Sequence, residues 1–392
     1  MKIETKAVHA GDRKKSGDSI PVTTPIYTAS SYIYERMEQL DKVFDREQPG
    51  DSYARYESPT NRALEELMAT LENGHAALAC SSGMTAVQFA LQAALLDRRK
   101  HIVAANALYG ATIRILQSIF EPLGVEATLV DICDLAAVEQ AIERTRPGCV
   151  LMETISNPLL RVGDIHAIAA LSRKAGAALL VDSTFATPMM VRPLELGANL
   201  VVHSLTKYLA GHGDVLGGVI VTDEAHAETV RTLSRMAGPV LGPFESYLTM
   251  RGVKTFPLRF ERQCQNACRV AQWLASQSSV ERVYFPADPN HPDASVIRRV
   301  FPEKLAGAMI SFELAGAGRL RVFEFMDRLK LIVRATSLGD VHSMMLYPAM
   351  SSHRDIAPKQ RERMGIRENL VRFSVGIENA DDIIGDLEQA MR

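Results

Sequence analysis

Between residues 51 and 245, short apolar runs alternate with amphipathic stretches, and this alternation limits the possible folds more than any other feature of the sequence. The apolar runs have the length of strands and cover residues 76–80, 101–105, 126–130, 149–153, 178–182, 200–203 and 217–222. Helical periodicity occurs in residues 63–71, 85–96, 111–123, 135–145, 165–175 and 226–235. Such strand–helix alternation predicts an α/β fold with a parallel sheet that helices cover on both faces.

The sequence on either side of this region follows other patterns. Residues 1–50 predict an irregular arm with one short helix near Met37 to Phe44. Beyond residue 246, a long helical region (244–276) precedes a strand-like run at 308–314, a helix-like stretch at 320–329, short runs at 331–333 and 371–375, and a helix over about 380–391. We therefore expect an arm (1–50), a large domain (51–245) and a smaller C-terminal α/β domain (246–392).

The composition is typical of a soluble globular protein. Hydrophobic residues make up 47% and charged residues 23% of the 392 residues, and the net charge is −2. This charge gives no general reason to expect nucleic acid or an anionic membrane as a partner. Residues 1–15 lack the apolar core of a signal peptide, and no apolar run approaches the roughly 20 residues that span a bilayer. We expect a cytoplasmic protein.

The cysteines and histidines point to neither a disulfide framework nor a metal site. The five cysteines are odd in number and scattered along the chain, which favours free thiols. His203 and His212 flank a lysine, but their spacing matches no metal-ligand pattern. We expect no bound metal.

A lysine stands where one of the predicted strands ends. Lys207 follows the run that ends at His203, lies among the hydroxyl residues Ser204, Thr206 and Tyr208, and is followed by glycines. Open α/β sheets bind ligands at this edge, and lysine forms Schiff bases with pyridoxal phosphate (PLP), whose phosphate nearby hydroxyls can bind. Without other motifs, a solvated loop lysine among turn formers would be the better interpretation of these residues.

Two neighbouring segments add to this pattern. Asp182 ends another apolar run 25 residues upstream, and a carboxylate there can keep the PLP pyridine nitrogen protonated, although it could also cap a helix. Ser81-Ser82-Gly83-Met84-Thr85 follows a strand and opens a helix, so its backbone N–H groups can bind an anion. An ordinary capped helix start is the alternative.

Taken together, these segments resemble the Cys/Met metabolism family of PLP-dependent enzymes, which holds cystathionine γ-synthases, cystathionine and methionine γ-lyases, and O-acylhomoserine sulfhydrylases. The resemblance runs almost end to end. It includes Ala7-Val8-His9-Ala10-Gly11, Pro25-Ile26-Tyr27, Tyr53-Ala54-Arg55, Tyr109-Gly110, Glu153-Thr154-Ile155-Ser156-Asn157-Pro158, Ser337-Leu338-Gly339 and Arg372-Phe373-Ser374-Val375-Gly376. It implies a type I, aspartate aminotransferase-like fold with a mainly parallel, seven-stranded sheet, and PLP as the cofactor.

The resemblance also implies the roles of individual residues toward the cofactor. Lys207 binds the cofactor, Asp182 holds the ring nitrogen, Tyr109 stacks on the ring and takes part in acid/base chemistry, and Asn157 lies near the ring oxygen. The phosphate is held by Ser82, Gly83, Met84, Ser204 and Thr206, together with Tyr53 and Arg55 from a neighbouring subunit. This sharing makes a dimer obligatory, and the resemblance implies a homotetramer, a dimer of dimers with shared active sites. Ser58-Pro59-Thr60 departs from the usual Asn-Pro-Thr after Tyr-x-Arg.

Three residues are implied to face an amino-acid substrate. Arg372 sits in an apolar run, where a lone charge is unfavourable unless it is paired, and it binds the substrate α-carboxylate in the family. Ser337 lies near that carboxylate. Thr336 takes the place of the Glu that relatives acting on cystathionine commonly carry before Ser-Leu-Gly, and Ala111 replaces the Cys that methionine γ-lyases commonly carry after Tyr-Gly.

These motifs leave the final reaction open. In such enzymes the freed Lys207 amine takes the substrate α-proton and a group on Cγ leaves. The outcome is either a 2-oxo acid, ammonia and a thiol, or replacement of the γ-group as in cystathionine γ-synthases and sulfhydrylases. The missing acid at Thr336 favours substrates with an uncharged or thioether tail. We expect γ-elimination from methionine- or cystathionine-like substrates. Two other classes are a PLP-binding scaffold and an NAD-dependent enzyme, for which Gly211-His212-Gly213 lacks the full glycine fingerprint.

Overall fold

The computed structural model of the chain describes residues 1–15, 18–96, 99–354 and 357–392. Its centre is a seven-stranded sheet in the order β1-β7-β6-β5-β4-β2-β3. The strands are β1 (Ala76–Cys80), β2 (His101–Ala105), β3 (Glu126–Val130), β4 (Cys149–Glu153), β5 (Ala178–Asp182), β6 (Leu200–Ser204) and β7 (Gly218–Thr222). All seven predicted strands are present, and the α/β fold class is confirmed.

One strand of this sheet runs against its neighbours. β7 pairs antiparallel with β1 and β6, whereas the pairs from β6 across to β3 are parallel. A parallel neighbour requires a crossover connection, which is usually a helix. Residues 205–217, between β6 and β7, form turns instead. The chain therefore returns in the opposite direction, and the returning segment carries Lys207.

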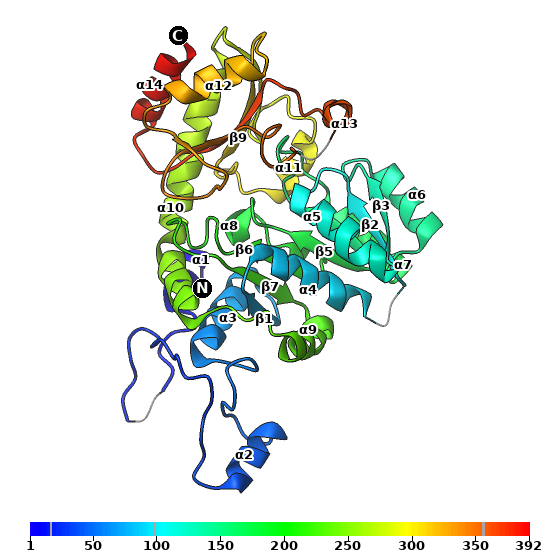
Figure 1. Cartoon of the computed structure of the whole chain (residues 1–392), viewed down its shortest axis with the longest axis vertical. Coiled ribbons are helices and arrows are strands. Elements are labelled where there is room, and N and C mark those ends of the chain that lie inside the picture. The colour runs from blue at the N-terminus through cyan, green and yellow to red at the C-terminus, as the bar shows by residue number, and fades with distance from the viewer. Residues whose placement is uncertain (16–17, 97–98, 355–356) are drawn as a thin grey trace.

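Helices pack against this sheet (Figure 1). They are α3 (Pro59–Glu72), α4 (Gly83–Leu95), α5 (Gly110–Ile115), α6 (Leu135–Thr145), α7 (Ile165–Ala175), α8 (Thr187–Met190) and α9 (Glu224–Ala237), with a π turn at Leu116–Phe120 and 3₁₀ turns at Glu121–Leu123 and Pro193–Leu196. Ser82, Asp134, Asp164 and Asp223 cap four of them by accepting backbone N–H groups, which stabilises each helix by about 1 kcal/mol.

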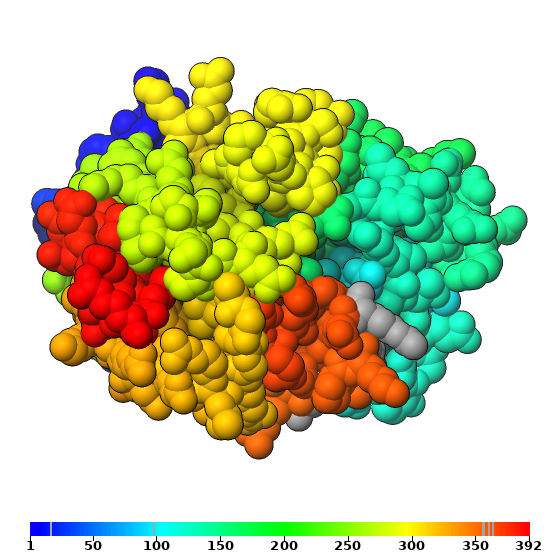
Figure 2. All heavy atoms as spheres, turned by 90° about the horizontal axis from the view of Figure 1, so that it is seen from above, coloured from blue at the N-terminus to red at the C-terminus, as the bar shows by residue number. Residues whose placement is uncertain are grey.

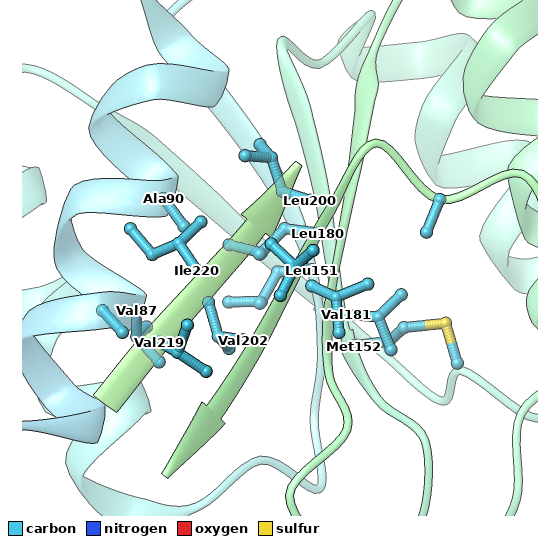
Figure 3. Close-up of a cluster of buried hydrophobic side chains, with 14 of the residues drawn as sticks. Val87, Ala90, Leu151, Met152, Leu180, Val181, Leu200, Val202, Val219 and Ile220 are labelled. Carbon is cyan, nitrogen blue, oxygen red and sulfur yellow. The ribbon is translucent and has the colours of Figure 1, made fainter. Parts of the chain in front are cut away.

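The strands are held in place by apolar side chains on both faces of the sheet. β4 and β7 are buried at every residue. Val219 and Ile220 of β7 lie beside Val87 and Ala90 of α4 in Figure 3. Burial of a valine or isoleucine side chain contributes roughly 1.5–3 kcal/mol. The core thereby fixes the strand ends at which the polar residues of the site stand.

A second, smaller sheet follows, in the order β10-β11-β12-β9-β8. Its strands are β8 (Val280–Tyr284), β9 (Met309–Leu314), β10 (Val333–Arg334), β11 (Met344–Leu346) and β12 (Leu370–Ser374), and its helices are α11 (Ala294–Val300), α12 (Arg319–Arg328), α13 (Pro358–Arg363) and α14 (Ala380–Met391). The sequence did not predict β11, because three residues are too few to show a period. In Figure 2 these segments (yellow to red) lie beside the teal segments of the large sheet.

The long helix α10 (Pro243–Ala275) links the two sheets. Its buried apolar side chains from Met250 to Cys264 belong to the core of the large sheet, and those from Ala267 to Leu274 belong to the core of the second sheet. In Figure 1 the helix runs upright along the left side, from the large sheet to the second sheet. It therefore couples the position of the second sheet to the edge of the first.

The N-terminal segment contains two helices, α1 (Ile3–His9) and α2 (Met37–Phe44). The sequence predicted α2 but not α1, a seven-residue helix that places Ala7 in the core. α2 has no buried residue and lies at the end of the molecule opposite the second sheet (Figure 1). Across the described residues, no helix combines the length and apolar character needed to cross a membrane.

Candidate active site

A cavity of about 230 Å³ opens at the edge of the large sheet where β4, β5 and β6 end. Segments of the second sheet close it from the other side, because Thr336, Leu338 and Arg372 of β12 contribute to its wall. The site residues predicted from the sequence that line it are Ser82, Gly83, Met84, Tyr109, Asn157, Asp182, Ser204, Thr206, Lys207, Thr336 and Arg372. Residues from both ends of the chain are thus brought to one place.

Lys207 lies in the turn after β6, with its amine directed to the second sheet. Its Nζ donates a hydrogen bond of 3.0 Å to Ser337 Oγ. Thr206 fixes the turn, since its Oγ1 donates to Gly217 O at 3.2 Å and accepts from Gly217 N at 3.0 Å. Burial, and secondarily the nearby Arg372, lowers the pKa of Lys207 to about 8. A neutral amine is the nucleophilic form of lysine, so this environment suits covalent chemistry.

The loop before α4 forms a close cradle against β6 and β7. Ser82 caps the helix, its Oγ accepting from Thr85 N at 3.1 Å. A Cβ added at Gly83 would lie 2.9 Å from Ser204 Cβ, and one at Gly218 would lie 2.2 Å from Ser82 O. Both glycines are therefore required by the close approach of the backbones. The cradle leaves helix-start N–H groups beside hydroxyls, a combination that fits a phosphate.

Asp182 ends β5 beside this cradle. Burial raises the pKa of its carboxyl, and hydrogen bonds from Thr184 act in the opposite direction. One of them runs from Thr184 N to Asp182 Oδ1 at 2.9 Å. A desolvated carboxylate is stabilised by a buried cation. The protonated pyridine nitrogen of PLP is such a cation, so the residue present fits the cofactor.

Arg372 is a buried cation on β12, with 3% of its surface exposed. Its Nη1 donates to Asn157 Oδ1 at 3.1 Å and its Nη2 to Ser337 O at 3.2 Å. Within the described ranges, its Nε has no hydrogen-bond partner and no carboxylate pairs with it. Burial lowers the pKa of the guanidinium to about 10. A buried arginine with a free donor is suited to bind a carboxylate in bidentate fashion.

Tyr109 and Thr336 stand at the accessible part of the cavity. Tyr109 precedes α5 and is 40% exposed, and its backbone N donates to Glu153 Oε1 at 2.6 Å. Thr336 is exposed and lines the cavity next to Leu338. Both side chains are therefore available to a ligand.

Tyr53 and Arg55 lie outside the cavity of their own chain. Tyr53 is 45% exposed and forms an isolated bridge with Ser31. The Arg55 guanidinium lies 5.6 Å from the Tyr53 ring centroid and 4.8 Å from that of Tyr56, and it donates to Arg235 O. The structure of one chain does not bring these two residues to the other predicted site residues.

Several lining residues were not expected from the sequence. They are Val87, Ile155, Thr184, Phe185 and Leu216. Thr184 Oγ1 accepts from Ser204 N at 2.9 Å and so joins the ends of β5 and β6. The sequence could have identified Thr184 from its position two residues after Asp182. The four apolar lining residues could not be identified, because their sequence pattern is that of core residues.

A desolvated lysine, a strand-end aspartate and a glycine cradle on a seven-stranded sheet define a PLP-dependent enzyme of fold type I. The chain matches the Cys/Met metabolism PLP-dependent enzyme family over residues 4–392 and belongs to that family. The family resemblance seen in the sequence is thereby confirmed, and so is PLP as the cofactor.

Similar proteins differ in the reaction that their names state. The chain is 40% identical over 395 residues to L-methionine gamma-lyase of Fusobacterium nucleatum subsp. polymorphum, covering 99% of this chain and 98% of the relative. It is 41% identical over 389 residues to cystathionine gamma-synthase of Mycobacterium bovis, covering 99% and 96%. The crystal structure of cystathionine gamma-lyase from Lactobacillus plantarum complexed with L-serine has a TM-score of 0.91 at 37% identity, covering 100% and 98%.

Proposed function

We propose that this protein catalyses γ-elimination on a methionine- or cystathionine-like amino acid, consuming water and releasing a 2-oxo acid, ammonia and a thiol. The observation that carries the proposal is the placement of Lys207 between the cradle at Gly83 and the buried Arg372. One cavity thus offers an anchor for the cofactor, an amine, and a cation for the substrate carboxylate. The similarity to a methionine gamma-lyase supports the reaction type.

Each residue has a defined task in this proposal. Pyridoxal phosphate supplies an electron sink for the charge that develops on the substrate Cα. Lys207 holds the cofactor and, once freed, its Nζ takes the α-proton; a pKa of about 8 leaves part of the amine neutral near neutral pH. Asp182 holds the proton on the ring nitrogen.

The remaining residues bind and orient. Ser82, Gly83, Met84, Ser204 and Thr206 would hold the phosphate of the cofactor, and Tyr109 and Asn157 would contact its ring. Arg372 binds the α-carboxylate with Ser337 beside it. Thr336 faces the distal part of the substrate, where its neutral hydroxyl gives no charged partner to a distal ammonium. This last feature favours a thioether substrate.

γ-Replacement is the alternative, and the identity to a cystathionine gamma-synthase favours it equally. The two reactions share every step up to departure of the γ-group. They differ in whether water or a thiol completes the reaction. The residues that line the cavity are compatible with both.

We also propose the assembly and the division of the chain. The exposed Tyr53 and the half-buried Arg55, which lie apart from their own cavity, suit a shared site in a dimer, and two such dimers would form a homotetramer. The arm (1–50), the large domain (51–245) and the C-terminal domain (246–392) would be its parts, with α10 passing from one domain core to the other. We place the enzyme in the cytoplasm.

The deciding experiment compares methionine, cystathionine and O-acetylhomoserine, each with and without added cysteine. γ-Elimination predicts release of a 2-oxo acid and ammonia from methionine without a second thiol. If O-acetylhomoserine with cysteine instead gives cystathionine at a far higher kcat/KM, the enzyme is a γ-synthase. Absence of turnover in every mixture, with PLP bound, would indicate a non-catalytic member of the family.

A further inference from the structure

Glu153 is a buried carboxyl at the site for which the proposed reaction has no use. It ends β4, is 8% exposed, and its Cα is paired in register with that of Asp182 on β5. Two carboxyls on neighbouring strands at the cavity wall are unfavourable when both are charged. A specific role for Glu153 would explain why a carboxyl is kept at this unfavourable position.

The contacts of Glu153 reach two different parts of the site. Its Oε1 accepts from Tyr109 N at 2.6 Å, and it also accepts from the backbone N–H of Asn157. Asn157 Oδ1 in turn accepts from Arg372 Nη1, and Arg372 Nη2 donates to Ser337 O.

The chain of hydrogen bonds continues to the lysine. Ser337 Oγ accepts from Lys207 Nζ at 3.0 Å. One carboxyl therefore stands at the start of a network that includes the stacking tyrosine, the carboxylate-binding arginine and the amine. Groups in such a network fix each other's positions.

Glu153 also separates two cavities. It lines the active-site cavity and a second cavity of about 500 Å³ that contains Asp131, Cys133 and Arg161. Among the residues that the structure describes, Asn157 also lines both. Loss of the Glu153 side chain would thus remove both an acceptor and part of a wall.

We propose that Glu153 is a positioning residue, which sets Tyr109 and Asn157, and through Asn157 the guanidinium of Arg372, in register for substrate binding. The proposal rests on the proposed function, since it assigns Arg372 to the substrate. Burial first and Asp182 second raise the pKa of Glu153 well above its usual range, and the two backbone N–H groups act against this. The positioning task requires an acceptor at Oε1 and does not require a charge.

This distinction can be tested with Glu153→Gln and Glu153→Ala. Glutamine retains an acceptor oxygen of the same reach, whereas alanine removes it. For Glu153→Ala we expect KM to rise at least about tenfold, because it displaces groups that bind the substrate and a misplacement of about 1 Å can cost up to about a hundredfold. Glu153→Gln should stay within about threefold of the parent enzyme. Two further measurements do not depend on turnover: visible circular dichroism of bound PLP, which reports on ring stacking, and the Kd of L-norleucine, which has no γ leaving group.

The matched control is Glu313→Gln. Glu313 is also a buried carboxyl, 1% exposed, but it binds Tyr284 and Arg367 in the second sheet, outside both cavities. The variant Glu313→Gln should lower thermal stability without changing norleucine affinity. A purely structural role for Glu153 would produce the same result in Glu153→Ala, and an unchanged norleucine Kd in that variant overturns the proposal.

The remaining outcomes are also decisive. If Glu153→Gln loses norleucine affinity as strongly as Glu153→Ala, the charge is required and positioning alone is wrong. If Glu153→Ala does not fold, Glu153→Asp replaces it, because the shortened side chain cannot reach both N–H groups and should raise the norleucine Kd. A parent protein that binds neither PLP nor norleucine would instead overturn the proposed function.

Discussion

Lys207 Nζ and Ser337 Oγ, 130 positions apart in the sequence, are joined by a hydrogen bond of 3.0 Å. This bond connects the turn after β6 in the large sheet to a loop of the second sheet. The backbone O of Ser337 accepts from Arg372 as well. The amine and the guanidinium thus share Ser337 as a common hydrogen-bond partner.

The lysine itself provides the first prediction. Lys207→Ala should abolish turnover and remove the visible absorption of lysine-bound PLP, while the phosphate cradle at Gly83 continues to bind the cofactor noncovalently. Absorption spectra before and after gel filtration measure both properties. A variant that retains the parent spectrum would assign the covalent role to another lysine.

A second prediction concerns stability against pH in the cofactor-free protein. Burial lowers the pKa of Lys207 from 10.5 to about 8. Between these pH values the unfolded chain binds one more proton than the folded chain, so the free energy of unfolding rises with pH. The unfavourable contribution is complete below about pH 8 and is at most about 3 kcal/mol, at about 1.4 kcal/mol per pKa unit.

Lys207→Met should therefore raise the Tm of the cofactor-free protein at pH 7, and the gain should shrink as the pH approaches 10. Thermal unfolding of both proteins at several pH values measures this difference. A gain of the same size at pH 7 and pH 10 would mean that packing, and not the charge, is responsible.

Much of the fold was predictable because it depends on local pattern. The strands of the large sheet are apolar runs with polar residues at their ends, so both the runs and strand-end residues such as Asp182 could be identified. The direction of β7 was less accessible, since it follows from a connection without a helix. α1 and β11 are too short to show a period.

The site was predictable only in part, for a different physical reason. Residue type and position at a strand end identify Lys207, but no local pattern indicates its bond to Ser337. Phe185 and Leu216 line the cavity and could not be distinguished from core residues, because the same apolar character serves both purposes. The proposed role of Glu153 depends on the backbone N–H groups that it binds, and the sequence does not show which N–H groups a side chain will reach.

The third prediction concerns the buried guanidinium. Arg372→Ala should weaken substrate binding by roughly 2–5 kcal/mol, the usual effect of truncating one partner of a buried charge pair. The PLP spectrum should stay normal. Steady-state kinetics together with cofactor titration separate the two effects. Loss of PLP binding at unchanged KM would place Arg372 at the phosphate.

Sharing of the active site can be tested by complementation. Arg55→Ala and Lys207→Ala should each be inactive alone. Mixed dimers refolded from both should recover activity, because one of their two sites carries both defects and the other carries neither. Differently tagged chains allow the mixed dimers to be isolated. Inactive mixed dimers would indicate sites built within a single chain.

The last prediction concerns the distal part of the substrate. Thr336 is exposed at the cavity wall and offers no charge to a distal ammonium. The parent enzyme should therefore prefer a neutral thioether to cystathionine. Thr336→Glu should shift the ratio of kcat/KM values toward cystathionine by about tenfold or more, since a site with a matched polar partner discriminates better than one without. Thr336→Gln is the uncharged control of the same size and should leave the ratio near that of the parent. A parent enzyme that already prefers cystathionine strongly must use another acid for the distal ammonium, and Thr336 would then not set the preference.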